Sequence, residues 1–148
     1  MYTFPGNWCG VPTIVGHYLI QSVPATHGLI VLDITNGVKP VEVSRLKFSD
    51  TYKPHWTGWD AKTQRVVVTG KETRLFMVKL DQATGALALD NTFYDAEGKT
   101  GFNFEEREWP HGGEGIGPAP RSSLLALKGI LFSDNQRPIG LGNSCDVR

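Results

Sequence analysis

The sequence is poor in the features that mark several specialised classes of protein. Its 148 residues include two cysteines, Cys9 and Cys145, near opposite ends of the chain. This spacing indicates neither a disulfide framework nor a zinc site, although a single bridge between the two ends is conceivable. No apolar run approaches the roughly 20 residues that cross a bilayer, and the first ten residues do not resemble a signal peptide. We therefore expect no membrane partner, with the cytoplasm as the default compartment.

Net charge is also absent. Fifteen basic residues balance fifteen acidic ones, so no basic surface for a nucleic acid is indicated and we expect no nucleic-acid partner. The chain is 40% hydrophobic and 20% charged, a balance typical of globular proteins rather than disordered or collagen-like ones. A chain of this length is ordinarily one domain with a sizeable apolar core.

Helical periodicity is missing as well. No stretch before residue 121 repeats apolar residues at i, i+3, i+4 and i+7, so the sequence predicts an all-β body. One expected strand, Lys39–Phe48, alternates through Val41 and Val43 and then slips by one position before Leu46. The runs rich in β-branched and large apolar residues, separated by turn residues, are 17–23, 28–34, 39–48, 65–70, 74–80 and 86–94.

These strands repeat as a group. The segment 17–48 superposes on 64–94 with an offset of about 47 residues. Asp33 and Asp81 then occupy matching hairpin turns, each followed four residues later by glycine. A repeat of about 40–50 residues with four short strands is typical of a β-propeller blade. A duplicated meander in an ordinary β-sandwich is the alternative. On the propeller interpretation the blades span approximately 10–55 and 56–105.

Three segments resemble a known family. "GLIVLDITNGVKPVEVSRLKF", "KPHWTGWDAKTQRVVVTG" and "RLFMVKLDQATGAL" are similar to late blades of YVTN-type (WD40-like) propellers. Among the YVTN-type propellers, the three segments resemble the group that contains selenium-binding proteins and methanethiol oxidases. The resemblance covers about 15–120. It implies a partial β-propeller of two to three four-stranded antiparallel blades, with a further blade starting in 106–120. It bears on fold more than on activity, because function depends on a site.

Pro-His occurs twice beside tryptophan, at Pro54-His55 and Pro110-His111. Proline fits at the first residue of a strand because it lacks a ladder donor. In the resembled family Pro-His opens the innermost strand of a blade, so the imidazoles would face the central channel. There each histidine could be held by a backbone carbonyl, or could ligate a metal.

The resemblance to methanethiol oxidases implies copper or another transition metal as the cofactor. Trp56 and Trp59 flank His55 and could wall a small-molecule cleft, although blade packing would explain them equally well. The earlier unit carries Thr13 where a matching histidine would be expected, so two candidate ligands would not complete a coordination sphere. Asp60 could serve acid–base chemistry, or could cap the turn of an inner hairpin.

Strand patterning is lost at the C-terminal end. We interpret 121–148 as an irregular, atypical tail. One hypothesis is a shifted reading frame, because Arg121–Lys128 can be encoded so that the neighbouring frame reads Gly-Ala-Leu-Phe-Ser-Arg-stop. Sequencing the encoding DNA tests this.

Two functional classes follow from these patterns. The first is a fragment of a propeller scaffold that presents loops or a channel to a small molecule or protein, without a complete active site of its own. The second is a remnant of a metal-dependent oxidase of the selenium-binding or methanethiol oxidase type, or of a lactonase-like propeller enzyme. Two blades cannot close a ring that needs 4–8, so both classes imply the remaining blades of a larger propeller as partners.

Overall fold

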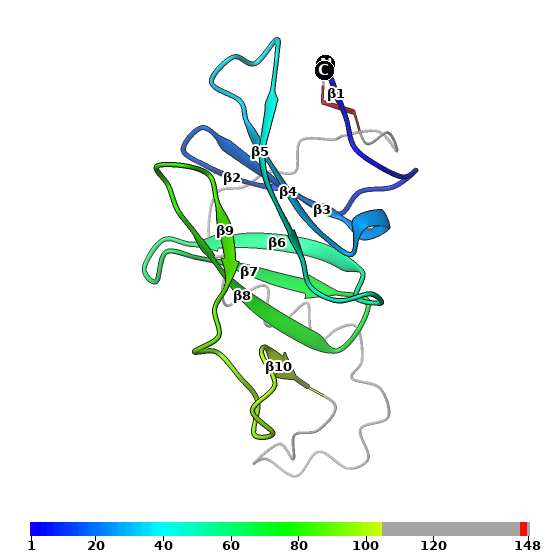
Figure 1. The fold of residues 1–148 in the computed structure, drawn as a ribbon, viewed down its shortest axis with the longest axis vertical. Coiled ribbons are helices and arrows are strands. Elements are labelled where there is room, and N and C mark those ends of the chain that lie inside the picture. The colour runs from blue at the N-terminus through cyan, green and yellow to red at the C-terminus, as the bar shows by residue number, and fades with distance from the viewer. Residues whose placement is uncertain (105–145, 148) are drawn as a thin grey trace.

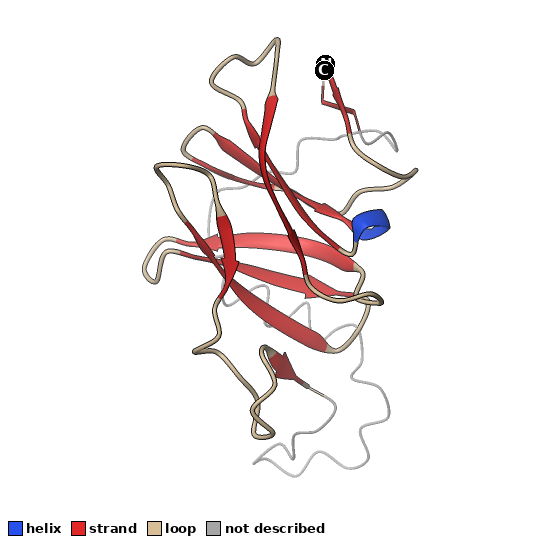
Figure 2. Cartoon of the chain, in the orientation of Figure 1, coloured by secondary structure: helices blue, strands red, loops and turns tan. Residues whose placement is uncertain are grey.

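The described chain consists of β-strands. A computed structural model describes residues 1–104 and 146–147, which form two larger antiparallel sheets and one short strand pair (Figures 1 and 2). One 3-10 turn, η1 (Pro24–Thr26), interrupts them. The expected all-β fold is confirmed. No helix among the described residues is long and apolar enough to cross a membrane. The predicted further blade at 106–120 and nearly all of the tail lie outside the described residues.

Each larger sheet is a meander in which consecutive strands pair. In the first sheet the order is β2 (Thr13–Val15), β3 (Tyr18–Val23), β4 (Gly28–Asp33) and β5 (Val41–Lys47). In the second sheet β6 (Pro54–Asp60), β7 (Arg65–Gly70) and β8 (Arg74–Leu80) follow one another. Both β9 (Leu87–Leu89) and β10 (Phe102–Asn103) then pair with β8. Neither sheet closes on itself.

The expected slip in the strand at 39–48 is a β-bulge. The register of β4 and β5 shifts between Val31 and Leu32, whose partners are Ser44 and Glu42, so Val43 is the additional residue. A bulge places two residues opposite one and turns the side chains beyond it to the other face. The slip predicted from the sequence is thus confirmed.

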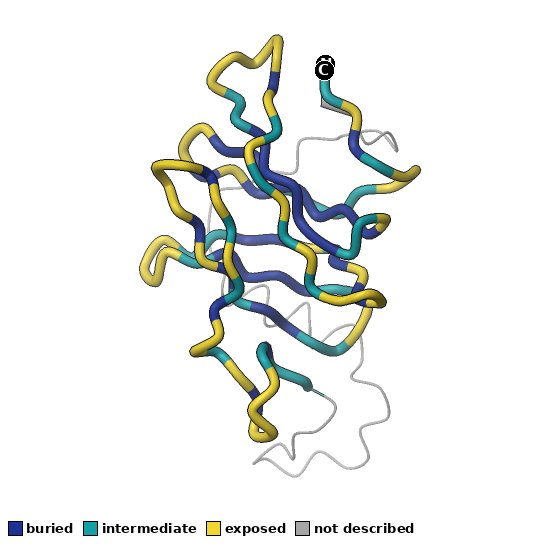
Figure 3. The backbone as a smooth tube through the Cα atoms, in the orientation of Figure 1, coloured by how far each residue is buried: buried dark blue, intermediate teal, exposed yellow. Residues whose placement is uncertain are grey.

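The core lies between the two sheets. Alternate residues of the two meanders face each other, as the period of two in a β-strand requires. The facing strands β3, β4, β7 and β8 are buried along most of their length (Figure 3). The buried cluster contains Val15, Tyr18, Ile20, Leu29 and Val31 from the first sheet, and Tyr52, Val66, Val68, Phe76, Val78 and Leu80 from the second sheet and its approach.

The outer face of the first sheet is covered by residues 1–9, here called the N-terminal strap. Phe4 is 3% exposed and packs in a second cluster with Leu19, Val23, Ile30 and Leu32 of β3 and β4. Tyr2 and Cys9 pack against the same cluster. Within the strap, β1 (Tyr2–Thr3) pairs antiparallel with β11 (Asp146–Val147). The two ends of the described chain therefore lie side by side (Figure 1).

The two sheets pack with equivalent strands next to each other. The first strands, β2 and β6, are in contact, and so are the last strands, β5 and β9; β6 also lies against β3. The chain therefore returns across the width of the first sheet after β5 before it starts β6. Along this return Phe48 and Tyr52 contact each other and Phe76, with ring centroids 4.8–5.2 Å apart. The crossing is thus fixed by aromatic packing.

We expect the Ile20→Ala variant to lose about 3 kcal/mol of unfolding free energy, because it removes a fully buried side chain and leaves a cavity between the sheets. Ile14 is the matched control, because it is 44% exposed on the neighbouring strand. Chemical denaturation measures both variants. Equal losses for Ile14→Ala and Ile20→Ala would contradict the assignment of the core.

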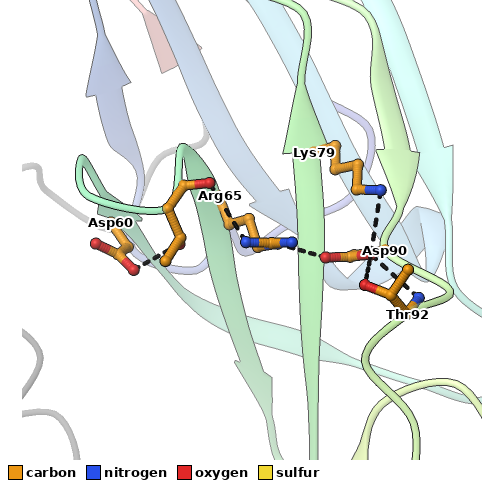
Figure 4. A network of polar contacts seen from close by, with 6 residues as sticks. Asp60, Arg65, Lys79, Asp90 and Thr92 are labelled. Atoms are coloured by element: carbon orange, nitrogen blue, oxygen red, sulfur yellow. Dashed lines mark hydrogen bonds and ion pairs between the residues drawn. The ribbon is translucent and has the colours of Figure 1, made fainter.

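A buried carboxylate ends the second sheet. The side chain of Asp90 is 1% exposed and lies between the Arg65 guanidinium, whose Nε donates to Oδ2, and the Lys79 ammonium, 3.3 Å from Oδ1 (Figure 4). The Thr92 hydroxyl donates to Oδ1 over 2.6 Å and the Thr92 amide donates over 3.1 Å. Hydrogen bonds from Thr92, and then from Arg65 and Lys79, hold the pKa of Asp90 well below its usual range.

Asp90→Asn should cost about 2 kcal/mol of unfolding free energy, because the amide leaves Arg65 and Lys79 without their counter-charge. The folded-state pKa of Asp90 is lowered, so its contribution is complete above the unfolded value near 4 and is lost as the pH falls below it. The variant should therefore lose less stability than the wild type between about pH 4 and pH 2. Urea titrations across this range measure both effects.

Asp81→Asn is the control for this experiment. Asp81 caps the β8–β9 hairpin on the surface by accepting from the Ala83 amide and the Thr84 hydroxyl, and contacts no cation among the described residues. A loss as large as that of Asp90→Asn would show that turn capping, rather than the two cations, makes Asp90 important.

Candidate ligand-binding surface

The first strand of the second sheet contains an irregularity at His55. The register of β6 with β7 shifts between Pro54 and Trp56, whose partners are Gly70 and Thr69. His55 is therefore the additional residue of a second β-bulge. Bulges next to functional sites change the direction of side chains, and here the imidazole and the Trp56 indole come within 5.5 Å of each other, centroid to centroid.

The bulge is joined to the first sheet through Val11. The Val11 amide donates to the His55 carbonyl over 2.7 Å, and the Val11 carbonyl accepts from the Thr57 amide and hydroxyl at 3.3 and 2.8 Å. These bonds form a parallel bridge between the approach to β2 and the strand β6. The backbone that carries His55 is thus fixed from both sides, by β7 and by Val11.

Gly10 makes this close approach possible. Its amide donates to the Ser22 carbonyl over 2.9 Å, and its carbonyl accepts from the Gln21 amide group over 2.6 Å. A Cβ atom at this position would overlap the His55 carbonyl and lie 2.8 Å from the Ser22 Cβ. Only glycine therefore fits between β3 and β6 without a shift of the backbone.

Three aromatic rings meet at this junction. The Trp8 ring stacks on the His55 imidazole with centroids 4.9 Å apart and an interplanar angle of 29°. Trp8 is 39% exposed and Trp56 is 37% exposed. Large indoles with solvent-accessible faces are common in recognition sites, because they bury much area with little loss of entropy. We refer to Trp8, His55 and Trp56 as the aromatic cluster.

Two polar groups adjoin the aromatic cluster. The Lys71 ammonium lies 5.6 Å from the centroid of the Trp8 ring, within range of a cation–π interaction. The Thr69 side chain is on the same face of the sheet as its cross-strand partner Trp56, and its hydroxyl is buried without a hydrogen-bond partner among the described residues. The surface thus combines π faces and one positive charge, above a buried hydroxyl.

The structure brings some of the predicted site residues together and separates others. His55 and Trp56 are neighbours in the aromatic cluster. Trp59 instead packs against the core cluster between the sheets, so for this residue packing, the alternative to a ligand cleft, is what the structure shows. His111 lies outside the described residues. Pro54 is the first residue of β6, as its chemistry predicted. Trp8, the third member of the cluster, and the adjoining Lys71 belong to no sequence motif, and only the nearby Gly10 indicates close packing.

Metal binding and acid–base chemistry were the two chemical roles predicted for residues near β6. No group of three or more His, Cys, Asp or Glu side chains there could hold a metal ion. Asp60 accepts from the Lys62 amide and the Thr63 hydroxyl, and these bonds, that of Thr63 first, lower its pKa. This confirms the predicted turn role of Asp60.

No family model, no curated protein and no solved structure matches the chain.

We expect Gly10→Ala to displace the strap from β6 and to separate Trp8 from His55, because the added methyl overlaps the His55 carbonyl. The near-ultraviolet circular dichroism of tryptophan should weaken, and the variant should lose about 2 kcal/mol or more of unfolding free energy. Gly37→Ala is the control, because nothing lies within 4 Å of a Cβ atom there. An unchanged spectrum for Gly10→Ala would contradict the packing described.

Proposed function

We propose that the chain is a two-blade portion of a β-propeller-type scaffold that binds a small ring-containing molecule at its aromatic cluster. Each sheet contains a meander of four consecutive strands, β2–β5 and β6–β9, and the second sheet adds β10. These meanders and the length of the repeat support the blade interpretation. On this proposal β2 and β6 are inner strands beside the channel of the propeller, and β5 and β9 are outer strands. On this proposal the described residues supply a binding surface and not a complete active site.

The arrangement of equivalent strands is the observation that carries the proposal. In a two-layer sandwich made by one continuing meander, β6 would lie opposite the strand it follows, β5. Here β6 lies against β2 and β3, and β9 lies against β5, which is the arrangement expected if the second sheet repeats the first by rotation about an axis. A parallel bridge at Val11 and Trp56 joins the two first strands. Successive propeller blades are related in this way around their axis.

The ligand class follows from the chemistry of the aromatic cluster. Exposed indole faces favour flat aromatic rings or the apolar face of a sugar ring. The Lys71 ammonium, close to Trp8, favours a ligand that carries a negative charge. His55 and Trp56 are on the bulged strand β6, which is held by β7 and Val11, so this part of the surface is preorganised and loses little entropy on binding.

The alternative function, a remnant of a metal-dependent oxidase or of a lactonase-like enzyme, stays a prediction from the family resemblance. Copper or another transition metal would require ligands beyond His55, which stacks on Trp8. No observation among the described residues favours this alternative over the scaffold.

Nuclear magnetic resonance with a library of aromatic acids and monosaccharide acids tests the proposal. The expected binders shift the indole N–H signals of Trp8 and Trp56 and leave that of Trp59 in place. Trp56→Ala should weaken such binding about tenfold, which corresponds to one lost aromatic contact of roughly 1.4 kcal/mol. Binders that shift only signals remote from the aromatic cluster would contradict the proposed surface.

A copper titration separates the two functions. The scaffold is expected to bind no stoichiometric Cu²⁺. One tightly bound equivalent that is lost in His55→Ala would support the metal enzyme instead. Tyr94→Ala is a suitable control in both experiments, because Tyr94 is also exposed (62%) but belongs to the loop after β9.

A further inference from the structure

The loop between β4 and β5 contains the only Asn-Gly pair in the sequence, Asn36-Gly37. Residues 35–39 are all exposed, at one end of the first sheet (Figure 3). The loop includes a β-turn in which the Lys39 amide donates to the Asn36 carbonyl over 2.9 Å. The Gly37 amide, inside this turn, donates to no described residue. Its nitrogen is therefore open to water and to the neighbouring side chain.

The side chain of Asn36 is folded back over this nitrogen. Its Oδ1 accepts from the Val38 amide over 3.2 Å, which is an Asx turn that closes a ring over the Gly37 peptide unit. The electrophilic Cγ atom is thus held on the side of the following backbone. A donor at Oδ1 also stabilises the negative charge that develops on this oxygen when a nucleophile adds to Cγ. Gly37 has no Cβ to shield its nitrogen, and nothing lies within 4 Å of where one would be.

We propose that Asn36 is a site of spontaneous covalent modification, in which its amide becomes a carboxylate through a cyclic imide. The Gly37 nitrogen loses its proton to solvent and attacks Cγ of Asn36, so that an N–Cγ bond forms. The Cγ–Nδ2 bond then breaks, and the leaving nitrogen takes up a proton and departs as ammonia.

Water opens the imide at either of its carbonyls. Opening at Cγ restores the normal backbone and leaves an aspartate. Opening at the backbone carbonyl of Asn36 leaves an isoaspartate, in which the chain continues through the side chain. In both cases one water is consumed and one ammonia is released, with no oxidation or reduction.

Either product changes the surroundings of the N-terminal strap. The neutral chain gains one negative charge, two residues from Val38, whose carbonyl accepts from the Met1 ammonium over 3.5 Å. In the isoaspartate the backbone runs through Cβ and Cγ, so the β4–β5 loop is longer by one carbon atom and the turn that carries Val38 changes shape. The bond from Tyr2 to Glu42 on β5 lies outside this turn. The modification thus acts on the first residue of the strap, independently of whether the aromatic cluster binds a ligand.

Peptide mapping by mass spectrometry of the full chain, incubated at mildly alkaline pH, tests the proposal. The peptide that contains Asn36 is expected to gain the mass of an amide-to-acid conversion and to appear as both aspartate and isoaspartate. Asn91 is the internal control, because it is also exposed but is followed by Thr92, whose amide donates to Asp90 over 3.1 Å. Its peptide should stay unchanged over the same period. Asn36 still intact after a synthetic peptide of residues 33–40 has been converted, or conversion to aspartate alone, would overturn the proposal.

Three variants test the assigned atoms. Gly37→Ala should react at least about tenfold more slowly, because its methyl group shields the attacking nitrogen while the fold has space for it. The Val38 side chain is exposed, so Val38→Ala, which keeps the amide donor, should react like the wild type. Val38→Pro removes the donor to Oδ1 and should react about tenfold more slowly, the effect of one lost hydrogen bond.

Near-ultraviolet circular dichroism verifies that each variant is folded. Equal rates for Val38→Ala and Val38→Pro would overturn the role of the Val38 amide. An undiminished rate in Gly37→Ala would overturn the attack by the nitrogen of residue 37.

Discussion

The apolar contact between the two facing sheets is the constraint on which the rest of the structure depends. Neither meander could bury its apolar face alone, and the shared cluster that includes Ile20, Val31, Val66 and Val78 removes both faces from water. Because equivalent strands lie next to each other, this contact also fixes β6 beside β2. The site on β6 is therefore a consequence of how the sheets pack rather than of any local motif.

The junction near Gly10 shows how this packing becomes a surface with specific chemistry. The segment before β2 has to pass between β3 and β6, where there is no space for a side chain. Its hydrogen bonds to His55 and Thr57 stabilise a bulge, and the bulge directs an imidazole and an indole toward Trp8. Backbone geometry, not side-chain attraction alone, thus assembles the aromatic cluster.

Much of the fold could be predicted because apolar periodicity is a local signal. The strands at 65–70 and 74–80 have the predicted bounds, and the slip before Leu46 marks a real bulge. The strand expected at 86–94 was wrong in length, because β9 ends at Leu89. There Asp90 turns inward to Arg65 and Lys79, an ion pairing between residues far apart in the sequence. The stacking of Trp8 on His55 is also a contact between residues far apart in the sequence, so Trp8 could not be assigned to the site. The core position of Trp59 was one of two alternatives that the sequence left open.

The bulge at Val43 gives the outer strand β5 an unusual sensitivity. On one side of it Glu42 bonds the Tyr2 hydroxyl of the strap, and on the other Ser44 donates to the Gly85 carbonyl of the neighbouring sheet over 2.6 Å. Because of the additional residue, adjacent parts of one strand bond to the strap on one face of the sheet and to the second sheet on the other face. Deletion of Val43 would shift one half of the strand by one residue relative to the other. All side chains of the shifted half would then point to the opposite face of the sheet. This strand should therefore tolerate replacement of its exposed residues far better than a change in its length.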